Sequence, residues 1–209
     1  MNRRIGVICA LMILAGSLVG CGGSNKVSED GGIVESNVAE IKKDGAVTNT
    51  IEEELDPDLY GDEDSFKEFL VRVSNQYNSD AGADRVSIKK IDMKDDMLTL
   101  VMEYATAEDF GTFNEYPFFY GTVADAYENG YDLNLQFTSA DGDSQASITR
   151  EELLEMGSRK IVIVQLPKDE LLTVDTGSKI LYYAGDAVTG VEKSKADMAG
   201  EGMACLVFK

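Results

Sequence analysis

The chain has 209 residues and a formal net charge of −19, from 19 basic and 38 acidic side chains. A surface this negative repels phosphate backbones and anionic lipid headgroups. This argues against nucleic acid as a partner and against membrane binding through a basic surface. The chain contains no histidine, which excludes catalytic triads that depend on histidine and zinc sites that are built on it.

The N-terminal 21 residues contain the parts of a secretory signal in order. Two arginines at positions 3 and 4 precede an apolar run over residues 5–14, and small residues follow that run. The run is too short to span a bilayer. The alternative is a short buried helix in which the cysteine at position 21 is incidental.

The end of this segment, Leu18-Val19-Gly20-Cys21, resembles the lipobox of bacterial prolipoproteins. In that family the signal is cut before the cysteine, and the cysteine is lipidated. The resemblance implies a signal peptide over residues 1–20 and a lipid such as palmitate on Cys21. It also implies an extracytoplasmic location, with the chain anchored to the cell membrane through that lipid.

Residues 21–56 are predicted to form a flexible acidic tether behind the lipidated Cys21. They contain no aromatic residue and carry excess charge, so they bury too little apolar surface to offset the entropy of ordering. Residues 47–55 are an exception, because they are compatible with a short helix or an edge strand. The remainder, residues 57–209, is predicted to be a single domain.

Helical spacing and capping pairs predict three to four helices in this domain. Ser65 and Glu68 fit a capping box that opens a helix over residues 65–77. A second helical patch covers 106–113, and Pro117 fits the first turn of a third helix that ends near residue 130. Thr149 and Glu152 fit another capping box, which predicts a helix that ends before residue 157.

Alternating apolar residues predict the strands. They lie in a hairpin over 86–104 with a bulge near residues 89–90, a half-buried strand over 131–138, a central strand over 161–164, a second hairpin over 172–183, and a last strand over 204–208. Residues 185–202 are predicted to be a long polar connection. Because strands occur in runs, the sequence favours an α+β fold with a mostly antiparallel sheet on which the helices pack.

One polar stretch, residues 141–152, resembles the twelve-residue calcium loop of EF-hand proteins. Such a loop carries oxygen ligands at positions 1, 3, 5, 7, 9 and 12. Those positions hold Asp141, Asp143, Gln145, Ser147, Thr149 and Glu152. The sequence departs from the pattern at position 6, which holds Ala146 instead of glycine, and in the strand predicted in front of the loop. The alternative is a polar loop in which Thr149 and Glu152 cap a helix. Calcium is the one cofactor suggested.

A second stretch, residues 116–120, is rich in aromatic side chains. They are Tyr116, Phe118, Phe119 and Tyr120. On a helix, successive residues point about 100° apart, so these rings do not share one face. Either the segment is buried on all sides as part of the core, or it presents an aromatic ring for a sugar or an apolar peptide residue.

Cys205 lies in an apolar run and is predicted to be a buried, inert thiol, because no histidine is present to activate it. The sequence therefore favours a lipid-anchored lipoprotein of the cell surface with a non-enzymatic role, a module that binds a ligand or a protein. Two alternatives stay open. One is a calcium-stabilised surface domain with the 141–152 loop as its site. The other is a hydrolase that uses a pair of carboxylates.

Overall fold

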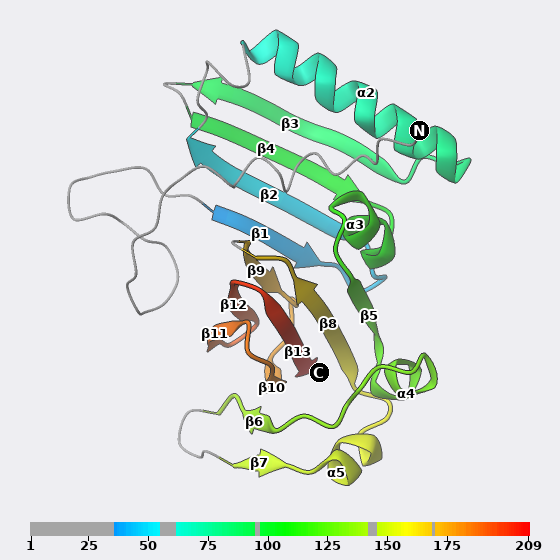
Figure 1. Ribbon diagram of the computed structural model, residues 1–209, viewed down its shortest axis with the longest axis vertical. Helices are drawn as coiled ribbons and strands as arrows, with labels where there is room; N and C mark the ends of the chain where they lie inside the picture. The colour runs from blue at the N-terminus through cyan, green and yellow to red at the C-terminus, as the bar shows by residue number, and fades with distance from the viewer. Residues whose placement is uncertain (1–35, 55–61, 95–96, 142–145, 169) are drawn as a thin grey trace, which may run out of the picture.

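The computed structural model describes residues 36–54, 62–94, 97–141, 146–168 and 170–209 (Figure 1). The predicted α+β class is confirmed, since helices pack on two sheets in which antiparallel pairing dominates. The signal segment, Cys21 and the first part of the predicted tether lie outside the described residues.

The first sheet has seven strands among the described residues. In spatial order they are β11 (Val188–Glu192), β12 (Lys195–Ala199), β9 (Leu171–Asp175), β1 (Ser36–Ile41), β2 (Val47–Glu54), β4 (Met97–Tyr104) and β3 (Val86–Lys94). Every pair is antiparallel except β1 with β9, which run parallel. Strands from both ends of the chain therefore share this sheet.

The second sheet has six described strands, and all of its pairs are antiparallel. In spatial order they are β5 (Phe118–Thr122), β8 (Lys160–Leu166), β13 (Gly202–Phe208), β10 (Ile180–Ala184), β6 (Phe137–Ser139) and β7 (Ser147–Ile148). The described helices are α2 (Glu63–Ala81), α3 (Ala107–Phe113), α4 (Val123–Glu128) and α5 (Arg150–Glu155). In Figure 1, α2 lies along the first sheet, α4 and α5 lie beside the second, and α3 lies where the two sheets meet. None of the described helices is long and apolar enough to cross a membrane.

The predicted tether over residues 21–56 is wrong for its second half. Residues 36–54 form β1 and β2, and β2 lies between β1 and β4 rather than at an edge. Four small or branched apolar side chains on these strands are buried; they are Ala39, Ile41, Val47 and Ile51. Alternation of such residues suffices for a strand without any aromatic side chain. The domain therefore includes residues well before the predicted start at 57.

Other predicted elements are confirmed. The helix predicted over 65–77 is α2, although its N-cap is Asp62, whose carboxylate accepts the backbone N–H of Ser65 at 2.8 Å. The predicted pairing of Ser65 with Glu68 as a capping box is thus wrong. The hairpin over 86–104 is β3 and β4, and their register shifts between Ile88 and Lys90, as the predicted bulge requires.

Four other predictions about elements are wrong. Pro117 leads into strand β5 instead of a helix. Of the expected strand over 131–138, only residues 137 and 138 are in a strand, β6, which ends at residue 139. The expected hairpin over 172–183 is two strands in different sheets, since β9 pairs with β1 and β12 while β10 pairs with β13 and β6. The expected connection over 185–202 contains β11 and β12. Strands β5, β9 and β10 pair with partners that are distant in the chain, whereas β11 and β12 form a local hairpin whose second strand also pairs with β9.

The core has two parts, and the second sheet separates them. A large cluster fills the space between the first sheet, α2, α3 and one face of the second sheet, and a smaller cluster lies between the other face and the α4–α5 side. On β8, Val162 and Val164 belong to the large cluster, and Ile161 and Ile163 belong to the small one. This confirms the prediction that residues 161–164 form a strand covered on both faces.

Candidate functional site

The connection from α3 to β5 has an unusual backbone that shapes the surface around it. The N–H of Tyr116 bonds the carbonyl of Gly111 at 3.1 Å, and the N–H of Glu115 bonds the carbonyl of Thr112 at 3.3 Å. This is a Schellman motif, in which the residue after the C-cap is usually glycine. Here that residue is Glu115, with a φ of 61°. A non-glycine residue is strained in this left-handed region, so the glutamate is kept at a cost in stability.

Gly111 brings α3 close to the start of β5. A Cβ at position 111 would lie 2.8 Å from the Cβ of Phe118 and 2.8 Å from the carbonyl oxygen of Tyr116. Real atoms do not approach so closely, so only glycine permits this packing. The carbonyl of Pro117 then accepts the N–H of Gln165 at 3.0 Å, which starts the pairing of β5 with β8. The proline thus extends the second sheet.

A hollow of about 370 Å³ lies at this junction. Its walls come from α3, the following turn, the start of β5 and the segment after α4. They are Glu108, Gly111, Thr112, Glu115, Tyr116, Pro117, Phe118 and Tyr131. The volume is near the lower end of the range for ligand sites. It suits a small molecule or one side chain of a partner.

The charged groups in the wall of this hollow are both carboxylates. Glu108, Thr112 and Glu115 follow one another at spacings of four and three residues, which places them along one side of α3 and its end. No lysine or arginine lines the hollow, and in the part of the chain that the structure describes neither glutamate forms an ion pair. The hollow therefore has a negative rim without a fixed counter-ion from the described residues.

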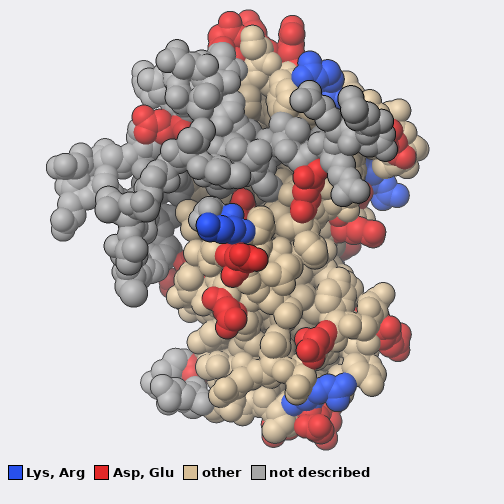
Figure 2. All heavy atoms as spheres, in the orientation of Figure 1, with Lys and Arg blue, Asp and Glu red and all other residues tan. Residues whose placement is uncertain are grey.

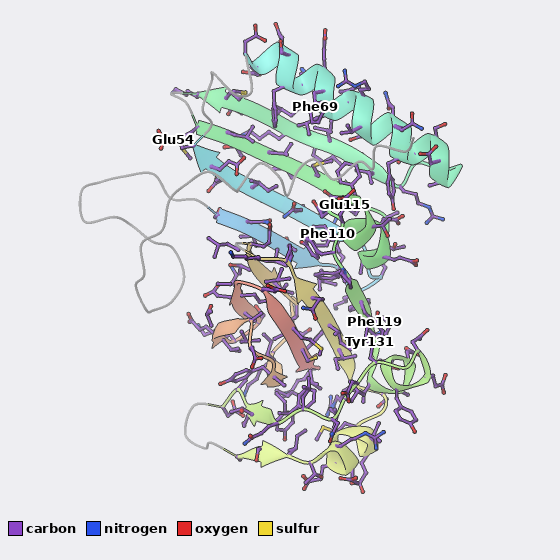
Figure 3. All side chains as sticks on the ribbon, in the orientation of Figure 1. Glu54, Phe69, Phe110, Glu115, Phe119 and Tyr131 are labelled. Atoms are coloured by element: carbon purple, nitrogen blue, oxygen red, sulfur yellow. The ribbon has the colours of Figure 1, made fainter. Side chains whose placement is uncertain are left out.

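Tyr131, from the segment after α4, also lines the hollow. Its ring packs against Phe119, with the ring centroids 4.7 Å apart, and Figure 3 shows these two side chains next to each other beside β5, with Glu115 on the α3 side. Partial burial raises the pKa of the Tyr131 phenol, and the nearby Glu108 carboxylate raises it further. The charge of Glu108 therefore acts on the Tyr131 hydroxyl. The tyrosine supplies an aromatic face and a hydroxyl to the same space.

The predicted aromatic residues divide between core and surface because residues 118–122 form a strand, in which neighbouring side chains alternate between faces. Tyr116 and Phe118 are buried in the large cluster and contact Phe110 edge-to-face. They close the inner end of the hollow. Phe119 and Tyr120 are half-buried.

Tyr120 faces away from Phe119 and is held by its own contacts. Its ring stacks on Phe208, the ammonium of Lys160 lies 4.9 Å from its centroid, and its hydroxyl donates to the carbonyl of Lys43 at 3.2 Å. These contacts connect the β1–β2 turn to the second sheet. Of the two half-buried rings, Phe119 is the one that contacts the lining of the hollow, through Tyr131.

The predicted calcium loop is only partly within the described residues, since Asp143 and Gln145 lie outside them. Ser147 pairs with Thr138 in the β6–β7 ladder, and Asp141 forms an ion pair with Lys179 at 2.5 Å. Glu152 accepts the N–H of Thr149 at 2.8 Å in a capping box, as the alternative interpretation expects. A strand, β6, precedes the loop. Within the described ranges no group of acidic, cysteine or histidine side chains is arranged to hold a metal ion. Calcium binding by this loop stays a prediction.

Two further groups lie in the core. Cys205 is fully buried, and burial raises the pKa of its thiol to about 12, which agrees with an inert thiol. Glu170, in the β8–β9 connection, is 3% exposed and accepts an amide N–H of Asn37 at 3.3 Å. The oxygen of Asn37 in turn accepts from Asn49 at 2.7 Å. Burial raises the pKa of the Glu170 carboxyl to about 7, with a contribution from Glu53 that acts in the same direction.

Charge alone does not locate the site on this acidic chain. On the face drawn in Figure 2, acidic groups are more frequent than basic ones and are scattered over the upper and lower parts of the molecule. The hollow at α3 differs because it combines carboxylates with aromatic walls and a concave surface. The sequence pattern predicted none of Glu108, Glu115 and Tyr131 as site residues. Tyr131 lies 23 and 16 residues after the two glutamates, and nothing local predicts that it meets them.

Comparisons with known proteins give no relative. No family model, no curated protein and no solved structure matches this chain.

Proposed function

We propose that this protein is a lipid-anchored, extracytoplasmic lipoprotein whose domain is a non-enzymatic binding module, with the hollow at the end of α3 as its ligand site. The lipobox-like sequence Leu18-Val19-Gly20-Cys21 supports the anchor. The hollow carries the proposal for binding, because Glu108, Glu115 and the half-buried Tyr131 line the same concave surface. Such a combination orients a ligand as well as burying it.

The strained Glu115 is independent support for this location. Most proteins relieve a left-handed position after a helix by placing glycine there. This chain instead keeps a charged side chain at the rim of the hollow, with φ 61°. Backbone strain of this kind is concentrated at functional sites.

Thermal unfolding of the protein with a panel of small sugars, amines, carboxylates and short peptides tests the proposal. A ligand that binds the native state raises the melting temperature by mass action. We expect at least one class to do so, and we expect Tyr131→Ala to abolish the shift. Tyr127→Ala is the matched control, because Tyr127 is 51% exposed on α4 and does not line the hollow. A shift that survives Tyr131→Ala would place the site elsewhere.

A further inference from the structure

We infer, on the basis of the proposed function, that the ligand of the hollow is a small organic cation, an ammonium group on an apolar or aromatic body. The lining of the hollow includes the exposed Glu108 and Glu115 and the half-buried Tyr131, with the buried Tyr116 and Phe118 beneath them.

The charges in the hollow favour a cation over a neutral or anionic ligand. Both charged groups in the wall are negative, and neither forms an ion pair with a described residue. Another acidic residue of α3 does have a basic partner. Asp109, the neighbour of Glu108, faces inward, where it accepts the Tyr77 hydroxyl at 3.1 Å and lies 3.9 Å from Arg85. A bound ammonium group would give Glu108 and Glu115 the nearby positive charge that Arg85 gives Asp109.

The walls around the carboxylates suit the rest of such a ligand. The half-buried Tyr131 supplies the aromatic surface for a ligand, because Tyr116 and Phe118 are buried in the core. An aromatic ring attracts a cation through its face and buries apolar carbon through the same surface. Tyr131 adds a hydroxyl oxygen that accepts an ammonium hydrogen. The hollow of about 370 Å³ is large enough for a single ring and a short chain. An aromatic amine is therefore a suitable probe.

Titration calorimetry of the full chain in mild detergent tests this inference with three probes of similar shape. They are phenethylammonium, the neutral 2-phenylethanol and the anionic phenylacetate. We expect measurable binding of the cation, binding of the neutral probe at least about fivefold weaker, and no binding of the anion. Raising the salt concentration weakens the cation's binding, because the rim is exposed and its charge is screened.

Charge-removing variants show whether the binding comes from this hollow. Glu108→Gln and Glu115→Gln are each expected to weaken phenethylammonium binding about two- to tenfold while leaving the binding of 2-phenylethanol unchanged. Glu128→Gln, which removes a charge from the exposed end of α4, is the matched control and is expected to change neither.

Two results would overturn the inference. If the cation and the neutral probe bound equally, and Tyr131→Ala abolished both, the hollow would bind ligands without selecting charge. The proposed function would then stand without the ammonium assignment. Absence of cation binding, or binding that responds to Glu128→Gln as much as to Glu108→Gln, would reject the ammonium assignment. A ligand of another class that needs Tyr131 would still support the binding module.

Discussion

At the scale of single residues, Glu170 makes the stability of the fold depend on pH. Its carboxyl is buried in the β8–β9 connection, and its hydrogen bonds with Asn37 and through it with Asn49 tie that connection to β1 and β2. Burial raises the pKa to about 7 from an ordinary value of 4.5. The folded state therefore holds a proton that the unfolded state has already released between these two pH values. The contribution of Glu170 to the free energy of unfolding is greatest below about pH 4.5, and it is lost as the pH rises from there to about 7.

Glu170→Gln is expected to remove this pH dependence, because the amide keeps the shape and does not ionise. At pH 8 the variant gains up to about 3 kcal/mol in the free energy of unfolding relative to wild type, and at pH 4 the two are nearly equal. Urea unfolding at several pH values measures the difference. Glu128→Gln, at an exposed position, is the control. If both variants kept the same slope between pH 5 and 7.5, the assignment of the slope to Glu170 would be wrong.

At the scale of elements, β1 and β2 show what the sequence predicted poorly. Local pattern was sufficient for α2, for the β3–β4 hairpin and its bulge, and for β8, because each carries a strong periodic signal. The strands β1 and β2 have only small or branched apolar residues among charged ones, so low aromatic content made them resemble a linker. Their stability comes from neighbours that are distant in the chain, β4 and β9.

Distant neighbours also explain why the expected hairpin over 172–183 is not one. Leu172 pairs with Met198 in the first sheet, while Tyr183 pairs with Leu206 in the second, so two adjacent strands that look like a hairpin separate. Of the hollow, only Tyr116 and Phe118 were predicted as site residues, and they form its inner wall. Tyr131 meets Glu108 and Glu115 only through the tertiary fold, because it follows α4 while they lie on α3 and its end.

Ala39→Asp tests whether β1 is part of the folded domain. Ala39 is fully buried in the large cluster, so an aspartate there places a charge in the core and costs about 3 kcal/mol or more. We expect a large drop in melting temperature by circular dichroism. Glu40→Lys, at the exposed neighbouring position, is expected to change it little. Equal melting temperatures for Ala39→Asp and wild type would mean that β1 is not part of the folded domain.

At the scale of the whole molecule, the proposed lipid on Cys21 would place an acidic domain near a membrane. Anionic headgroups would repel the domain while the lipid would hold it at the surface. The site would then face the medium and capture ligands from outside the cell.

Cys21→Ser tests the anchor. In cells that produce the wild-type chain, we expect the protein in the membrane fraction and labelled by radioactive palmitate. The Cys21→Ser variant should lose the label. Cys9→Ser is the control, because Cys9 lies inside the proposed signal and leaves with it. Equal labelling of all three chains would contradict the proposed lipidation.

If the hollow at the end of α3 is a binding site, the chain accepts local strain at Glu115 for the sake of its ligand. Glu115→Gly tests this proposal, since one change relieves the left-handed backbone and removes the carboxylate. Urea unfolding and calorimetry with phenethylammonium are carried out on the same samples. We predict that the variant is more stable by about 0.5–1 kcal/mol and binds the cation several-fold more weakly. A variant that gains stability and binds as well as wild type would show that Glu115 serves no ligand.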